Sequence, residues 1–128
     1  MSDRFSVSAR ARSFGHAARG IGLVLRSQHN AWIHAVATVL VTLLGCLLDV
    51  TRYDWCWLVL ALSAVWASEA FNTALERLAD ATTKDIHPLV GQAKDAAAGA
   101  VLLTALGASL IGLLVLGPPL LAFAGLAD

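Results

Sequence analysis

This sequence has few charged residues, only two cysteines and no net charge. Only 14% of the 128 residues are charged, against roughly a quarter in ordinary soluble domains. Nine bases balance nine acids, which argues against a nucleic-acid binder and against a disordered tail. Cys46 and Cys56 lie in or beside apolar runs, which suits neither a disulfide scaffold nor a zinc site. The composition argues against a conventional soluble enzyme and leaves a small integral membrane protein.

The familiar nucleotide-binding motifs are missing too. The sequence contains no GxxxxGKS/T stretch, no GxGxxG turn and no HRD/DFG pair. The first 30 residues have no continuous apolar core, so we expect no cleavable signal peptide. A bound nucleotide would therefore have to be held by helix ends and surface residues.

Hydrophobic residues, 58% of the chain, gather in three runs that predict membrane spans. A spanning helix needs about 20 apolar residues. The first predicted span covers residues 31–48 and includes His34, which we expect to be a buried histidine with satisfied hydrogen bonds. The second begins at Trp55 and is long enough only if its helix continues past Glu69. We therefore expect a span over 55–82 with a cytoplasmic extension, which places ionisable groups at the membrane boundary.

The last apolar run, from Ala96 to Ala127, predicts the third span. We expect its helix to cover 88–117, because Pro88 suits a first turn and Pro118-Pro119 cannot continue the hydrogen-bond ladder. Small residues recur every four positions, which favours close packing against another helix, although an alanine-rich helix also produces such stripes by chance. The members of this stripe are Ala96, Ala100, Thr104, Ala108 and Gly112. A protomer this small needs partners, so we predict a homo-oligomer.

Residues 5–28 predict a helix of a different kind. Apolar and basic positions recur on separate faces, with Phe14, Ala18, Ile21 and Leu25 on one and Arg12, Arg19 and Arg26 on the other. This pattern is typical of an amphipathic helix on the inner leaflet, and a simple basic anchor explains it equally well. The predicted fold class is all-α: one integral membrane domain over 1–128, with this surface helix and three transmembrane helices.

Basic residues orient the predicted bundle. Eight of the nine lie before residue 35 or in the link that follows Ser68, whereas Arg52 lies in the short link between the first two spans. Under the positive-inside rule, the N-terminus and the long link are cytoplasmic. We therefore expect a multi-pass membrane protein with a cytoplasmic N-terminus.

Four polar residues near the end of the second span are the leading candidates for chemistry. Glu69, Asn72, Glu76 and Asp80 are spaced by three, four and four, which places them in a stripe along one helix face. At about 1.5 Å per residue from Trp55, Glu69 lies just inside a hydrocarbon core about 30 Å thick, where a carboxylate is a candidate general base. Glu76, nearer water, is better placed for a hydrated divalent cation. The competing interpretation is a solvated face of a helix that leaves the membrane.

A second polar cluster lies at the predicted start of the last span. His87-Pro88 begins this helix and Lys94-Asp95 follows, and a helix start favours anions. Acids for a metal, a base for deprotonation and a cation for phosphate are the parts that phosphoryl transfer needs. Taken alone, Lys94 also fits a juxtamembrane orientation anchor.

Both clusters belong to longer stretches of recognisable sequence. The first reads EAFNTALE over 69–76, and the second reads AKDAAAGAVL over 93–102. With Asp80, His87-Pro88 and an upstream segment, NAWIH over 30–34, these stretches resemble the bacterial diacylglycerol kinase and undecaprenol kinase family. The resemblance covers roughly residues 10–115 and combines an E-x-x-N-x-x-x-E…K-D pattern with three spans.

The resemblance implies a small homotrimeric enzyme of the bacterial inner membrane that moves the γ-phosphate of ATP, with Mg²⁺, onto a lipid alcohol. By position, Glu69 would be the general base and Asn72 would line the lipid site. Glu76 would bind the metal, together with Gln28. The other residues implied to contact ATP are Asp85, His87, Lys94, Asp95 and either Arg10 or Arg12. The product would be undecaprenyl phosphate or phosphatidic acid.

Two positions depart from the family's pattern. Gln28 stands where many members have a glutamate ligand, and a neutral amide adds no negative charge to a metal site. Trp32 stands where undecaprenol-type members usually have arginine. Other features resemble that type more than the diacylglycerol-specific enzymes: Asn30, Ile33, His34 and the His87-Pro88 pair. Two alternatives stay open, a kinase for diacylglycerol alone and a non-catalytic membrane subunit or small transporter.

Overall fold

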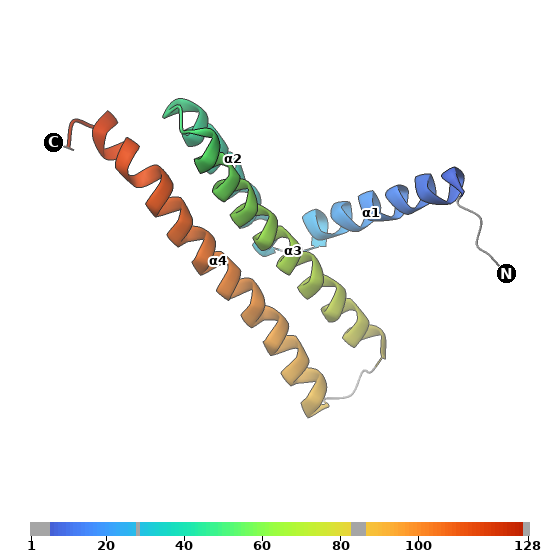
Figure 1. Ribbon diagram of the computed structural model, residues 1–128. Helices are drawn as coiled ribbons and strands as arrows, with labels where there is room; N and C mark the ends of the chain where they lie inside the picture. Colours follow the sequence, from blue (N-terminus) through green and yellow to red (C-terminus); the bar gives the residue numbers. More distant parts are fainter. Residues whose placement is uncertain (1–5, 28, 83–86, 127–128) are drawn as a thin grey trace.

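The residues that the structure describes form four helices and no strand. The computed structural model describes residues 6–27, 29–82 and 87–126. The helices are α1 (Val7–Ser27), α2 (His29–Leu47), α3 (Arg52–Thr82) and α4 (Pro88–Phe123). α3 and α4 lie side by side as an antiparallel pair, α2 packs against them, and α1 projects sideways from this bundle (Figure 1). The predicted all-α fold is confirmed.

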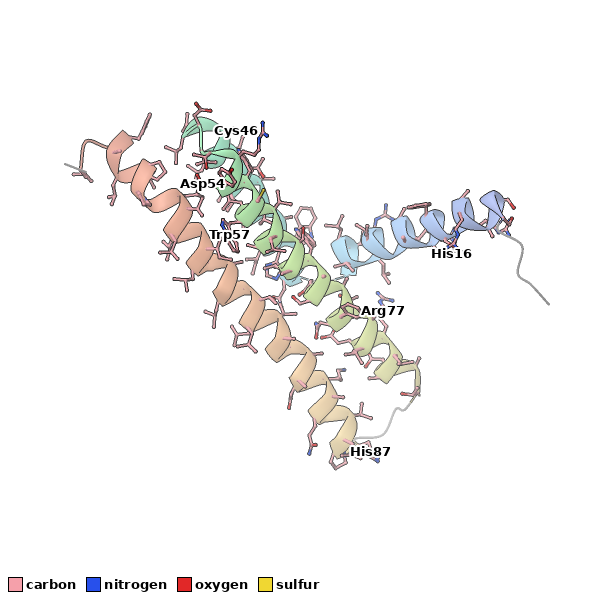
Figure 2. All side chains as sticks on the ribbon, in the orientation of Figure 1. His16, Cys46, Asp54, Trp57, Arg77 and His87 are labelled. Atoms are coloured by element: carbon pink, nitrogen blue, oxygen red, sulfur yellow. The ribbon has the colours of Figure 1, made fainter. Side chains whose placement is uncertain are left out.

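α2, α3 and α4 are long and apolar enough to cross a membrane. At about 1.5 Å per residue, α3 and α4 are about 46 and 54 Å long, whereas the hydrocarbon core is about 30 Å thick. Both helices therefore extend beyond the core. Figure 2 shows Cys46 and Asp54 at one end of the bundle and His87 at the other, and α3 runs on toward the His87 end past the level at which α1 meets it (Figure 1).

α3 begins earlier than the predicted Trp55 because a capping motif precedes the apolar run. The amide of Asp54 donates to Oγ1 of Thr51 at 3.3 Å, and Oδ2 of Asp54 accepts from the amide and the hydroxyl of Thr51 at 3.0 and 2.7 Å. This exchange is a capping box with aspartate in place of glutamate. The apolar run alone places the start of the helix at Trp55, because the first turn of α3 contains the charged residues Arg52 and Asp54.

α4 continues to Phe123, so the predicted end near Gly117 is wrong. Pro118 and Pro119 lie inside the helix. Each removes one backbone donor, but the φ that proline fixes near −65° is itself helical, and transmembrane helices tolerate proline. The hydrogen-bond ladder resumes beyond them, and the helix ends before Gly125, whose φ of +69° is left-handed and favours glycine.

The predicted small-residue stripe of α4 faces α3 only in part. Its members differ in exposure, with Thr104, Ala108 and Gly112 half-buried and Ala96 and Ala100 exposed. Residues spaced by four drift about 40° per step around a helix of 3.6 residues per turn, so the stripe winds away from the contact. The buried residues of α4 are Ala97, Val101 and Leu116.

Two hydrogen bonds between helices set the rotation of α3 about its axis. The hydroxyls of Ser68 on α3 and Thr104 on α4 lie 2.7 Å apart, and the indole Nε1 of Trp66 donates to Oγ1 of Thr38 on α2 at 3.0 Å. Such bonds contribute about 0.6 kcal/mol on average within membranes. One bond joins α3 to α4 and the other joins α3 to α2. Together they fix which residues of α3 face these two helices.

Gly45 is required where α2 approaches the start of α3. A methyl group on this residue would lie 2.8 Å from two ring carbons of Trp55. We expect Gly45→Ala to destabilise the folded protein by about 1–3 kcal/mol, the usual cost of overpacking, seen as a lower Tm in detergent. Adding Gly45→Ala to Trp55→Leu should lower Tm much less; an equal loss in both backgrounds would contradict the steric explanation.

Candidate active site

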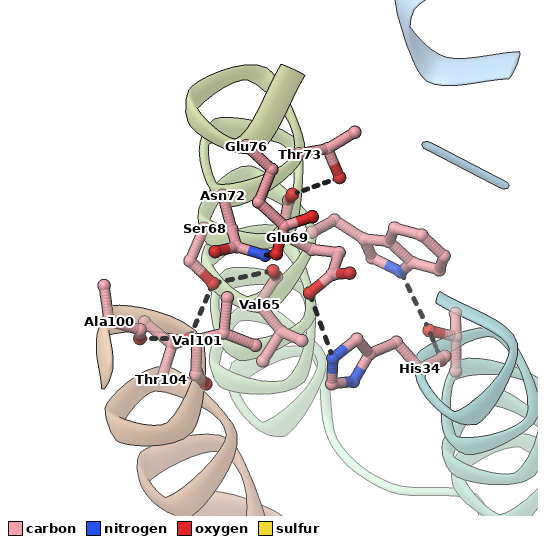
Figure 3. A network of polar contacts seen from close by, with 12 residues as sticks. His34, Val65, Ser68, Glu69, Asn72, Thr73, Glu76, Ala100, Val101 and Thr104 are labelled. Atoms are coloured by element: carbon pink, nitrogen blue, oxygen red, sulfur yellow. Dashed lines mark hydrogen bonds and ion pairs between the residues drawn. The ribbon is translucent and has the colours of Figure 1, made fainter. Parts of the chain in front are cut away.

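The predicted acidic stripe of α3 runs from the interior of the bundle toward water. Glu69 is fully buried, with 0% of its surface exposed, and Asn72 is buried beside it. Glu76 is half-buried and Asp80 is exposed. Figure 3 shows Glu69, Asn72 and Glu76 along one side of α3. The interpretation of these acids as one solvated helix face is therefore wrong for Glu69.

The polar atoms around Glu69 are incompletely paired. Among the described residues, neither carboxylate oxygen of Glu69 has a hydrogen-bond partner, and Oδ1 of Asn72 also lacks one. The amide Nδ2 of Asn72 donates to Oε1 of Glu76 at 3.3 Å, and the hydroxyl of Thr73 donates to the Glu69 carbonyl at 2.9 Å (Figure 3). Buried polar atoms are normally hydrogen-bonded, so these free oxygens mark a place suited to a polar ligand.

His34 of α2 faces Glu69 across the bundle. Its Nε2 lies 3.7 Å from Oε2 of Glu69, which is beyond hydrogen-bond distance, and has no hydrogen-bond partner within the described parts of the chain. The prediction that its hydrogen bonds are satisfied is therefore wrong at Nε2. The physical reason is that the Glu69 carboxylate, which His34 faces, lies beyond hydrogen-bond distance of Nε2.

The second cluster lies where α3 and α4 extend beyond the bundle. Nζ of Lys94 lies 3.0 Å from Oδ1 of Asp80, and the two side chains are 40% and 72% exposed. An exposed ion pair is weak, so another anion can replace Asp80 at little cost. His87 caps α4 through Nδ1, which accepts from the amide of Leu89 at 3.3 Å, with Pro88 in the first turn. Asp95 follows on α4 and is exposed.

Two clefts adjoin these residues. One, of about 470 Å³, lies between the ends of α3 and α4 and is mostly apolar, with Lys94 and His87 among its lining residues. The other, of about 360 Å³, lies between α1 and α3 and is lined by Ile21, Val24, Leu25, Trp66 and Ala70. The first has room for a small planar ring, and the second borders the residue that follows Glu69.

The oxygen atoms near Glu76 suit a hard divalent cation that is only partly held by protein. Within the described ranges, no three His, Cys, Asp or Glu side chains form a metal-binding group. Mg²⁺ commonly takes one or two carboxylates and completes its shell with water and substrate phosphates. The Glu76 carboxylate and the unpaired Oδ1 of Asn72 fit such an open site.

Not every predicted site residue lies near these clusters. Arg10 and Arg12 are in the first turns of α1, at the end remote from α3 (Figure 1). Gln28 and Asp85 lie outside the described residues. The sequence pattern does not predict the contact of His34 with Glu69 or the pairing of Asp80 with Lys94. An ionisable residue on an otherwise apolar span is itself a functional signal. His34, the ionisable residue of the first apolar run, carries that signal in the sequence.

Comparison with known proteins gives the family. Residues 15–116 match the family described as prokaryotic diacylglycerol kinase. The chain is 39% identical over 109 residues to the undecaprenol kinase of Bacillus subtilis, covering 85% of this chain and 89% of that one. It is 39% identical over 110 residues to the diacylglycerol kinase of Synechocystis, covering 85% and 63%, and 29% identical over 92 residues to that of Escherichia coli K12, covering 66% and 75%. The chain belongs to the prokaryotic diacylglycerol kinase family and is a multi-pass membrane lipid kinase.

Proposed function

We propose that this kinase transfers the γ-phosphate of ATP to the hydroxyl of undecaprenol or diacylglycerol at the inner leaflet of the bacterial inner membrane. The observation that carries the proposal is the fully buried Glu69 carboxylate, whose oxygens are both unpaired within the described chain. The concentration of basic residues before residue 35 and after Ser68 supports a cytoplasmic N-terminus.

In this proposal Glu69 is the general base. It takes the proton of the lipid hydroxyl while the hydroxyl oxygen bonds to the γ-phosphorus, and the bond from that phosphorus to the bridging oxygen of ADP breaks. The proton stays on Glu69 and ADP leaves with its phosphates. Burial between helices limits the access of water, which would otherwise compete with the lipid as acceptor. The apolar cleft beside Trp66 and Ala70 supports entry of the lipid from the side.

Glu76 is the proposed metal ligand, with Asn72 beside it and Gln28 as a further ligand. When bound there, Mg²⁺ would neutralise charge on the phosphates of ATP. Asn72 contributes in two ways: its Nδ2 holds the Glu76 carboxylate at 3.3 Å, and its unpaired Oδ1 faces the site. The same residue therefore links the metal ligand to the lipid end of the site.

Lys94 is proposed to exchange Asp80 for the phosphates of ATP. The adjoining cleft, whose lining includes His87, is the proposed binding site for the adenine ring of ATP. Asp85 and Asp95 are proposed as further contacts to ATP. An arginine of α1, Arg10 or Arg12, completes the set. Because these arginines lie at the end of α1 remote from α3 (Figure 1), we assign their contact with ATP to the site of a neighbouring protomer. A homotrimer in which α1 reaches the next subunit meets this requirement.

Undecaprenol is the first choice of substrate because the relative of that name is matched over 89% of its length. Diacylglycerol is the second choice, since the relative from Synechocystis is equally similar where it aligns. The test is transfer of labelled phosphate from ATP by the purified protein in mixed micelles, with each lipid offered separately. We expect labelled undecaprenol. Labelled diacylglycerol alone would reassign the substrate, and no labelled lipid from folded protein with Mg²⁺ would contradict the proposal.

A further inference from the structure

The imidazole of His34 is held in place by a small framework of its own. The rings of His34 and Trp66 meet edge to face, with centroids 6.3 Å apart and an interplanar angle of 72°. Oγ1 of Thr38 accepts from Nε1 of Trp66 at 3.0 Å and donates to the carbonyl of His34 at 2.7 Å. Trp66 also lies one turn before Glu69 on α3. The same contacts that join α2 to α3 therefore aim His34 at the Glu69 carboxylate (Figure 3).

The two polar groups that meet there are buried and complementary. The side chains of His34 and Glu69 are 13% and 1% exposed, and Nε2 and both carboxylate oxygens lack hydrogen-bond partners elsewhere in the described chain. The 3.7 Å between Nε2 and Oε2 is about 0.7 Å longer than an N–H···O hydrogen bond. Hydrogen bonds of active sites are often long without substrate and shorten when it binds. A side-chain movement of this size brings the pair together.

We propose that His34 is a positioning residue for Glu69, an inference that rests on the proposed role of Glu69 as general base. The Nε2–H group of His34 donates to Oε2 and fixes the orientation of the carboxylate. Oε1 is then left for the lipid hydroxyl. Without His34 the carboxylate can rotate about its terminal bond, and an error of about 1 Å in the position of a reacting group can lower a rate by about 100-fold.

The test compares two substitutions that differ in a single property. His34→Leu removes the donor, whereas His34→Gln keeps an N–H group at similar reach. We expect His34→Leu to lower kcat by about 10- to 100-fold with both KM values within about threefold of wild type. His34→Gln should recover most of that loss. The matched control is Thr42→Val on the same helix, because the Thr42 hydroxyl donates to the Thr38 carbonyl one turn earlier at 2.8 Å, a bond within α2 that should be dispensable.

A spectroscopic measurement tests the contact without using activity. In protein labelled with ¹⁵N in its histidine rings, Glu69→Gln should shift the Nε2 resonance of His34, identified by its loss in His34→Gln. Glu76→Gln should leave that resonance in place. The proposal is overturned if His34→Leu keeps wild-type kcat, if the folded leucine and glutamine variants lose kcat equally, or if the resonance ignores Glu69→Gln.

The two proposals can fail separately. If the wild-type protein labels a lipid and the His34 variants are as active, only the role of His34 is lost. If the wild-type protein labels neither lipid, the proposed function fails, and the resonance alone decides whether His34 and Glu69 interact. If His34→Leu does not insert into the membrane, the kcat of His34→Gln decides. A kcat near that of wild type supports the donor role, whereas the loss of about 10- to 100-fold expected for His34→Leu overturns it.

Discussion

Glu69→Gln should abolish measurable phosphate transfer to lipid while leaving the protein inserted in the membrane and able to bind ATP. The substitution keeps the size and shape of the side chain and removes its basicity. A positioned general base contributes about 10²- to 10⁴-fold to a rate. The kcat of Glu69→Gln should therefore fall by about 10²- to 10⁴-fold or more. KM for ATP should change little, because Glu69 is buried beside α2, whereas the proposed phosphate contact, Lys94, lies in the solvent-exposed extension.

The measurement is transfer from labelled ATP in mixed micelles, with insertion checked by membrane fractionation and ATP binding by equilibrium dialysis. Asp49→Asn is the matched control. It removes an acid from the opposite end of the bundle, and asparagine tolerates the left-handed backbone found there, where φ is +48°. The control should retain full activity. Loss of membrane insertion in Glu69→Gln would make Glu69 a structural residue instead.

The second large effect is expected at the metal. Glu76→Gln should raise the Mg²⁺ concentration needed for half-maximal activity by about tenfold or more, because Mg²⁺ takes few protein carboxylates and the described chain offers no three-residue acidic group to replace this one. Activity should partly return at high Mg²⁺. Glu76→Asp, which keeps the charge on a shorter side chain, should lie between the wild type and Glu76→Gln.

The readout is a Mg²⁺ titration of initial rate at saturating ATP and lipid. The two variants separate charge from shape, since a loss shared equally by glutamine and aspartate would point to geometry rather than to charge. A titration curve for Glu76→Gln that overlays the wild-type curve would remove Glu76 from the metal site. Gln28 and Asn72 would then be the ligands to test.

The sequence alone was enough for the fold class, the three spans and the acidic stripe. Hydropathy and helical periodicity are local properties, and a membrane requires each span to satisfy its own backbone hydrogen bonds. Glu69, Asn72 and Glu76 could be placed on one face from their spacing, because a helix sets the angle between successive residues. The differences at helix ends also have local causes: the capping box of Thr51 and Asp54 starts α3 before the apolar run, and α4 continues through Pro118-Pro119 because the φ of proline is helical.

Only the packed structure could pair residues on different helices. Neither spacing nor hydropathy says how far each helix is rotated about its axis, and that rotation decides whether His34 faces Glu69 or lipid. In this protein it is set by contacts such as those of Trp66 with Thr38 and Ser68 with Thr104. The pairing of Lys94 with Asp80 depends on how α3 and α4 align lengthwise. These contacts arise from the whole interface, so no single segment of the sequence encodes them.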